Sequence, residues 1–169
     1  SWPIPKAFRI ADKKKFNASI FEGNTINTPS MLCVEDAIDA LLWVKSIGGL
    51  DTLFKRSNSS LESITNWIER TSWVEFISLK KETCSNTGIT FKIIEDWFTK
   101  IDVSQQREVM KKITSLLSKE KVANDINGYP KAPPSFRVWG GGTVESNDVS
   151  TLLPWIEWAY QEVKLQYNK

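Results

Sequence analysis

Segments of helical periodicity alternate with short segments of strand periodicity from residue 31 onward, and this alternation constrains the fold more than any other feature of the sequence. Between residues 31 and 47, apolar residues recur at spacings of three and four, which is typical of a helix. The apolar face is so wide that we expect it to be buried on more than one side. The glycine pair at 48–49 ends this helix, and a second helical pattern begins at Leu50.

The rest of the chain continues the alternation. Pro154 lies inside the last helical pattern, so we expect a kink or a restart of the helix there. Strands and helices in this order predict an α+β fold, with an antiparallel or mixed sheet covered by helices on one face. The predicted strands cover residues 73–77, 88–94 and 136–139, and the predicted helices cover residues 104–120 and 147–165.

The 169-residue chain contains no histidine, which narrows the chemistry that it can perform. A Ser-His-Asp or Cys-His apparatus, a zinc site of the HExxH type and imidazole acid–base catalysis are excluded within these residues. The two cysteines, Cys33 and Cys84, have neither disulfide-framework nor metal-ligand spacing. We therefore expect no metal site and a reduced, cytoplasmic protein.

The charge balance does not favour a nucleic-acid partner. Lysine and arginine total 22, aspartate and glutamate total 20, and the net charge is +2. The basic run at 13–15 fits a solvated turn, because no aromatic or arginine residues are interleaved with it. No apolar run reaches the roughly 18 residues that a membrane span requires. We expect a chain that binds neither nucleic acid nor membrane.

A polar run precedes the first predicted helix. Thr28 or Ser30 is suited to cap that helix, and Glu35 and Asp36 complement its positive end if they fall in the first turn. One cap uses one side chain, so the remaining hydroxyl and amide groups are spare. A helix start with spare donors is suited to a phosphate or a carboxylate, although a capped helix after a polar turn explains the same residues.

Arg137 is the second candidate for binding an anion. In an extended segment, Arg137 and Trp139 share one face of the strand, and Phe136 and Val138 share the other. An arginine between large apolar residues offers a fork to a carboxylate. A surface arginine on an edge strand is the alternative. The glycines at 140–142 lack the GxGxxG spacing, so we expect a flexible turn there.

Several stretches of the sequence resemble one known family. They are "WPIPKAFRI", "GNTINTPSMLCVEDAIDAL", "SIGGL", "WIERTSWVEF", "SNTGITFKI", "APPSFRVWGGGTVES" and "LLPWIEWAY". Similar stretches occur in the same order in the C-terminal portion of phosphoserine aminotransferases, which are class V aminotransferases that depend on pyridoxal phosphate. The resemblance covers almost the whole chain.

The resemblance implies a fold, a domain division, an oligomeric state and a reaction. It implies the small C-terminal domain of the fold-type-I pyridoxal-phosphate transferases at residues 49–169, and the end of the large cofactor-binding domain with a linking helix at residues 1–48. It also implies a cytoplasmic homodimer with active sites between subunits. The reaction would be transamination between 3-phosphohydroxypyruvate and glutamate in serine biosynthesis.

The resemblance also implies roles for particular residues. Asn27 and Thr28 match the family residues that reach the phosphate of pyridoxal 5'-phosphate in the neighbouring subunit, and Arg137 matches the arginine that takes the substrate α-carboxylate. The family's Schiff-base lysine lies upstream of the stretch resembling "WPIPK". We therefore expect no catalytic residue in this chain and an inactive fragment. Pro130 stands where relatives carry a basic residue, which leaves substrate preference open.

Two alternatives remain at the level of sequence. One is another class V aminotransferase, of the alanine–glyoxylate or serine–glyoxylate type. The other is an interaction module without catalytic activity. Comparing the turnover of phosphoserine and of serine by the complete enzyme tests the first alternative. Whether the chain alone is a stable monomer with little exposed apolar surface tests the second.

Overall fold

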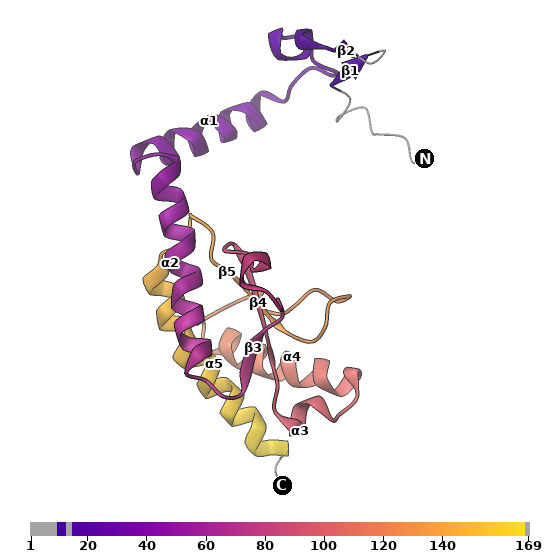
Figure 1. Ribbon diagram of the computed structural model, residues 1–169, viewed down its shortest axis with the longest axis vertical. Helices are drawn as coiled ribbons and strands as arrows, with labels where there is room; N and C mark the ends of the chain where they lie inside the picture. The colour runs from indigo at the N-terminus through magenta and orange to yellow at the C-terminus, as the bar shows by residue number, and fades with distance from the viewer. Residues whose placement is uncertain (1–9, 13–14, 168–169) are drawn as a thin grey trace. The chain divides into compact units, whose positions relative to one another are not determined.

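The computed structural model describes residues 10–12 and 15–167 (Figure 1). The chain divides into two compact units, Ser1–Ile47 and Gly48–Lys169. The assignment of the first unit to the end of a larger domain remains a prediction.

The described part of the first unit consists of a small hairpin, a short 3-10 helix and one long helix. Strands β1 (Ala11–Asp12) and β2 (Lys15–Phe16) pair antiparallel, and η2 spans Ala18–Glu22. Helix α1 spans Met31–Ser46, as the periodicity predicted. None of its residues is buried, and Leu32 and Leu41 are 72% and 68% exposed. No other described element of the unit covers the helix, so the expected burial of α1 on more than one side stays a prediction.

Two glycines with positive φ open the second unit. Gly48 has φ +105 and Gly49 has φ +82, a region that other residues rarely adopt. A Cβ atom on Gly48 would also lie 2.7 Å from Oγ1 of Thr52. The first helix therefore ends at the predicted position, and α2 (Leu50–Glu69) follows directly.

A three-stranded antiparallel sheet lies at the centre of the second unit. Its order is β3 (Val74–Phe76), β4 (Gly88–Ile93) and β5 (Phe136–Trp139), with η3 (Lys81–Thr83) between the first two strands. Alternate residues of β4 and β5 are buried, as a sheet with one covered face requires. This confirms the predicted α+β fold with an antiparallel sheet. The buried apolar residues of the three strands are Val74, Ile89, Phe91, Ile93, Phe136 and Val138.

Helices α4 (Val103–Lys119) and α5 (Ser146–Tyr167) complete the core with α2, and the short α3 (Asp96–Thr99) follows β4. Asp102 begins α4 with a capping box that includes Gln105. Helix α5 packs against both α2 and α4 (Figure 1). It runs through Pro154 as one continuous helix, so the expected restart does not occur.

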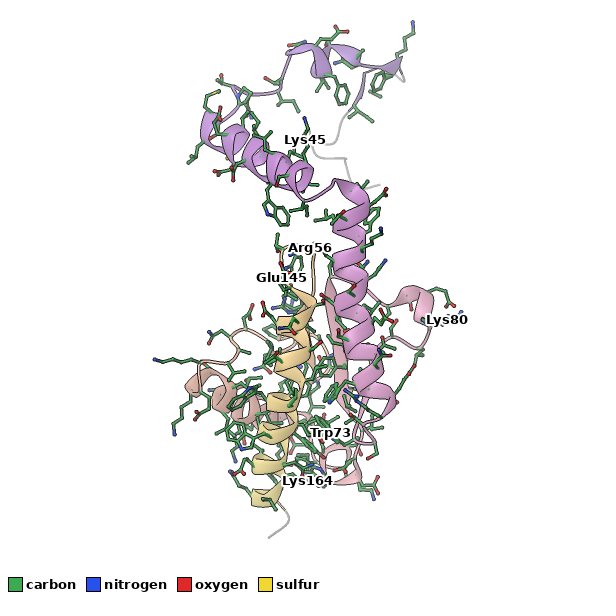
Figure 2. The ribbon with its side chains drawn as sticks, turned by 90° about the vertical axis from the view of Figure 1, so that its left-hand side faces the viewer. Lys45, Arg56, Trp73, Lys80, Glu145 and Lys164 are labelled. Carbon is green, nitrogen blue, oxygen red and sulfur yellow. The ribbon has the colours of Figure 1, made fainter. Side chains whose placement is uncertain are left out.

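The core of this unit is rich in aromatic side chains. Trp73 stacks on Tyr160 of α5, with ring centroids 3.7 Å apart and planes 3° from parallel. Trp67 of α2 meets Trp73 and Phe91 edge to face. Figure 2 shows Trp73 among the side chains that crowd between the helices and the sheet. Edge-to-face contacts such as those of Trp67 add to the free energy gained by burying the rings.

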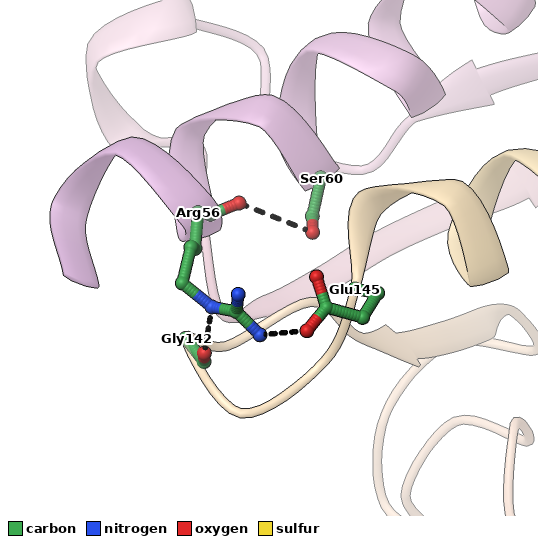
Figure 3. A network of polar contacts seen from close by, with 4 residues as sticks. All are labelled: Arg56, Ser60, Gly142 and Glu145. Carbon is green, nitrogen blue, oxygen red and sulfur yellow. Dashed lines mark hydrogen bonds and ion pairs between the residues drawn. The ribbon is translucent and has the colours of Figure 1, made fainter. Parts of the chain in front are cut away.

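The glycine turn after β5 is closely packed, which corrects the expectation of a flexible turn. A Cβ atom on Gly142 would lie 2.3 Å from Leu53, and one on Gly140 would lie 2.8 Å from Ile89. Arg56 of α2 donates from Nε to the Gly142 carbonyl at 2.6 Å and from Nη2 to Glu145 (Figure 3). The glycines are needed because α2 and β4 approach the turn so closely.

Over the described residues, no helix is both long and apolar enough to cross a membrane.

Candidate functional site

Arg137 lies in the middle of β5, opposite Thr90 of β4. The predicted alternation is confirmed: Phe136 and Val138 are buried on one face, and Arg137 and Trp139 lie on the other. The side chain of Arg137 is only 17% exposed. It therefore differs from an ordinary surface arginine, although β5 is an edge strand of the three-stranded sheet.

The segment before β5 runs back along its first residues and places two side chains beside Arg137. The backbone N–H of Arg137 donates to the carbonyl of Ile126 at 2.8 Å, and that of Gly128 donates to the carbonyl of Ser135 at 2.8 Å. A Cβ atom on Gly128 would lie 2.5 Å from Oγ of Ser135, so glycine permits this close approach. The backbone hydrogen bonds fix the positions of the residues on either side, Asp125 and Tyr129.

Asp125 contacts one edge of the Arg137 guanidinium, and the ring of Tyr129 lies against one of its faces. Its Nη2 donates to Oδ2 of Asp125 at 2.8 Å and lies 3.3 Å from the Asp125 carbonyl oxygen. The ring of Tyr129 lies under the group, with its centroid 4.7 Å from Cζ. Nε is buried and has no hydrogen-bond partner among the residues that the structure describes. The N–H of Nε is therefore unsatisfied, and an acceptor reaches it only when a group that covers it moves.

Two cavities adjoin the same segment. One, of about 230 Å³, is lined by Asn124, Asp125 and Asn127 together with hydroxyl groups of α4. The other, of about 320 Å³, is lined by Arg107 of α4 and by loop residues that include Asn127, Gly128 and Pro130. Neither lining includes Arg137 or Tyr129, so the cavities adjoin the loop that positions the guanidinium but do not enclose the guanidinium itself.

Asn27 and Thr28 lie in the first unit, just before α1, and both are exposed. The hydroxyl of Thr25 donates to the carbonyl of Asn27 at 2.8 Å, which shapes the turn. Within the described part of the chain, the side chains of Asn27 and Thr28 have no hydrogen-bond partner, and Ser30 occupies the N-cap position without a side-chain cap bond. These amide and hydroxyl groups fit an anion such as a phosphate.

Ser30 is the N-cap residue of α1, one of the two expected, but its hydroxyl makes no capping hydrogen bond, contrary to expectation. The first turn of α1 contains no acidic residue, because Glu35 and Asp36 follow one turn later. The backbone N–H groups at the start of α1 therefore receive neither a side-chain cap from Ser30 nor an acidic side chain in the first turn.

The sequence-based candidates fall into different units, with Asn27 and Thr28 in the first and Arg137 in the second. Sequence reasoning missed the role of Asp125 and the stacking of Tyr129, because neither follows from residue spacing. Among the described residues, no group of three or more Cys, Asp or Glu side chains is placed to hold a metal ion.

Comparison with known proteins identifies relatives of the chain. No family model matches it. It is 43% identical to the phosphoserine aminotransferase of Methanosarcina barkeri and 42% identical to that of Methanosarcina mazei, over 164 residues in each case. Each match covers 97% of this chain, and the chain spans 42% of the length of these curated relatives.

Solved structures agree about the fold. The phosphoserine aminotransferase of Bacillus circulans subsp. alkalophilus superimposes with a TM-score of 0.69 at 16% identity, over 85% of this chain and 37% of that protein. A second phosphoserine aminotransferase structure, from a study of radiation damage to its Schiff base, gives a TM-score of 0.68 over 86% of this chain. At this level of identity the structures show the fold alone.

The sequence matches show what the chain is similar to: part of an aminotransferase, over 97% of this chain. More narrowly, its relatives are phosphoserine aminotransferases, which confirms the resemblance seen in the sequence motifs. Coverage of about two fifths of those relatives fits a C-terminal portion.

Proposed function

We propose that this chain is the substrate-anchoring C-terminal part of a phosphoserine aminotransferase. The whole enzyme would exchange an amino group between glutamate and 3-phosphohydroxypyruvate in serine biosynthesis, as a cytoplasmic homodimer. The observation that carries the proposal is 43% identity to such an enzyme over 97% of the chain. Sequence identity at this level, in a match that includes residues of both units, is strong support for a shared role.

Arg137 is proposed to bind the α-carboxylate of the amino-acid substrate. Its planar guanidinium presents parallel N–H donors, a geometry that matches the two oxygens of a carboxylate. Tyr129 supports one face of the group, with 4.7 Å between the ring centroid and Cζ. Because the side chain is 17% exposed, its charge is less screened by solvent than that of a surface arginine.

Asn27 and Thr28 are proposed to bind the phosphate of pyridoxal 5'-phosphate held by the neighbouring subunit. The amide of Asn27 and the hydroxyl of Thr28 supply neutral donors, and the start of α1 adds backbone N–H groups and a favourable helix dipole. When bound, the cofactor supplies an electron sink for the bond that is broken. The residues of this chain hold the reactants and exchange no proton with them.

The lysine that carries the cofactor is proposed to belong to the part of the relatives that this chain does not span. The exposed apolar residues of α1 support the proposal of a larger assembly. Met31, Leu32, Leu41 and Leu42 are each more than half exposed, and apolar surface of this extent is typical of a face that another part of a protein covers.

A chimaeric enzyme tests the proposal. This chain replaces the matching portion of the Methanosarcina barkeri enzyme, and transamination of phosphoserine with 2-oxoglutarate is measured. We expect turnover, and we expect Arg137→Lys to raise the KM for the amino acid about tenfold to a hundredfold, because the ligand loses a charge-assisted fork. The exposed Arg70→Lys is the matched control and leaves KM unchanged.

Two outcomes would contradict the proposal. One is a folded chimaera that binds the cofactor but transaminates serine in preference to phosphoserine, which would favour a serine–glyoxylate type of enzyme. The other is stoichiometric labelling of a single lysine when the chain alone is treated with pyridoxal phosphate and borohydride. That labelling would place the cofactor lysine within these residues.

A further inference from the structure

We propose that Asp125 is an internal placeholder for the carboxylate ligand of Arg137. In the ligand-free protein the Asp125 carboxylate occupies one arm of the guanidinium, and an incoming carboxylate displaces it. The inference rests on the proposed function, because it assumes that Arg137 binds a carboxylate. Beyond that function, the inference assigns to Asp125 an influence on the affinity and selectivity of Arg137 for carboxylate ligands.

The contact between the two side chains is incomplete. Asp125 reaches Arg137 with a single carboxylate oxygen, at 2.8 Å from Nη2, and its own carbonyl oxygen lies 3.3 Å from the same nitrogen. Nε has no acceptor. A carboxylate bound through both oxygens would use Nη2 and Nε together, which satisfies the unpaired donor. A bidentate ligand therefore gains more from the guanidinium than Asp125 does.

The backbone holds Asp125 in position. The carbonyl of the next residue, Ile126, accepts the backbone hydrogen bond of Arg137. The backbone of Asp125 is therefore held beside β5 independently of the conformation of its side chain. Its φ is +53, a left-handed conformation that aspartate and asparagine tolerate better than most residues. This conformation directs both the carbonyl and the carboxylate of Asp125 at the same nitrogen of Arg137.

The energetics favour displacement. The side chain of Asp125 is 86% exposed, whereas that of Arg137 is 17% exposed. An ion pair with one exposed partner is weak, and the released carboxylate is readily hydrated. Tyr129 keeps the guanidinium plane fixed while the partner exchanges. Asp125 therefore lowers the affinity for every carboxylate by a small factor and disfavours ligands that cannot use both donors.

Asp125→Asn tests the proposal with little change of shape, because asparagine also tolerates the left-handed conformation. The isotope-labelled full chain is titrated with glutarate, an unreactive dicarboxylate, and binding is followed by NMR. We expect the affinity for glutarate to rise about twofold to fivefold, the range expected when an exposed ion pair no longer competes. Asp96→Asn removes an equally exposed aspartate that pairs with Lys100, and it leaves the affinity unchanged.

A second measurement follows the displacement itself. In the unmodified chain, glutarate should shift the carboxylate carbon signal of Asp125 and the Nε–H signal of Arg137 together. If glutarate shifts Arg137 but not Asp125, or if Asp125→Asn weakens binding or leaves it unchanged, the placeholder role is overturned. Thermal unfolding of the variant shows whether its fold is intact.

Arg137→Lys separates the two proposals. If this variant loses the glutarate response while Asp125→Asn fails to strengthen it, Arg137 is a carboxylate site and the placeholder is wrong. If glutarate gives no response that depends on Arg137, the proposed function of Arg137 is wrong, and the placeholder proposal falls with it.

Discussion

At the scale of single residues, Glu95 of the second unit contacts three side chains, two of which lie more than 60 residues away in the sequence. It accepts hydrogen bonds from Trp97 at 2.8 Å and from the hydroxyl of Tyr160, and it pairs with Lys164 at 2.6 Å. Desolvation raises the pKa of Glu95, but its hydrogen bonds with Lys164, Tyr160 and Trp97 outweigh that effect, and the pKa is lowered overall. The network ties the end of β4 to the end of α5.

The lowered pKa of Glu95 predicts a particular dependence of stability on pH. A carboxylate with a lowered pKa in the folded state stabilises the protein above its unfolded pKa, and this contribution is lost as pH falls through the folded value. We expect Glu95→Gln to lower the free energy of unfolding by about 1–2 kcal/mol at neutral pH. The difference from the unmodified chain should shrink well below the reference pKa of about 4.3.

Urea denaturation across this pH range measures the effect. Glu62→Gln changes an exposed glutamate of α2 and is the matched control, with little effect at any pH. A loss of stability in Glu95→Gln that is the same in acid and at neutral pH would show that the charge of Glu95 is not what stabilises the network.

At the scale of secondary-structure elements, α5 is unusual because it contains Pro154 in its interior. Proline lacks the N–H that would donate to the carbonyl of Ser150, and its ring crowds that carbonyl. The helix nevertheless continues to Tyr167, because Leu153 and Ile156 on either side of the proline are buried in the core. Tertiary packing overrides the local preference.

Pro154→Ala should therefore stabilise the second unit. Pro154 is exposed, so alanine removes no buried contact and restores one backbone hydrogen bond. We expect the free energy of unfolding to rise by about 1–3 kcal/mol. Glu157→Ala, on the exposed side of the same helix, should change it far less. A lower stability of Pro154→Ala in chemical denaturation would contradict this account of the helix.

At the scale of the whole molecule, the buried core belongs to the second unit. Every residue of the described hydrophobic core lies between Ile64 and Val163, and none lies in α1. The first unit presents its long helix with its leucines exposed. The two units therefore depend on different contacts: the second carries its own core, and the apolar face of α1 lacks one within the described residues of its unit.

This difference predicts unequal effects of two leucine-sized truncations. Ile113→Ala removes a fully buried side chain of α4 and should cost about 2–5 kcal/mol of unfolding free energy. Leu41→Ala removes a side chain that is 68% exposed and should cost well under 1 kcal/mol. Denaturant titration of the full chain measures both. A large cost for Leu41→Ala would show that α1 is buried in solution.

The sequence by itself determined where most helices and strands form and which of their faces are buried. The periodicity predicted α1, α2, α4 and α5 and the three strands of the sheet, because the spacing of apolar residues reflects which face of each element is buried. It also predicted the two faces of β5, on which Arg137 is placed. The small α3 was missed because four residues are too short to show a period.

Only the tertiary structure decided which distant residues meet. Asp125 and Arg137 are 12 residues apart, and Glu95 and Tyr160 are 65 apart, yet each pair is hydrogen bonded. The packing of the glycine turn against α2 and the exposure of α1 are likewise absent from any local pattern. The physical reason is that periodicity reports the neighbours of a residue along one element, whereas the path of the chain sets its neighbours in space.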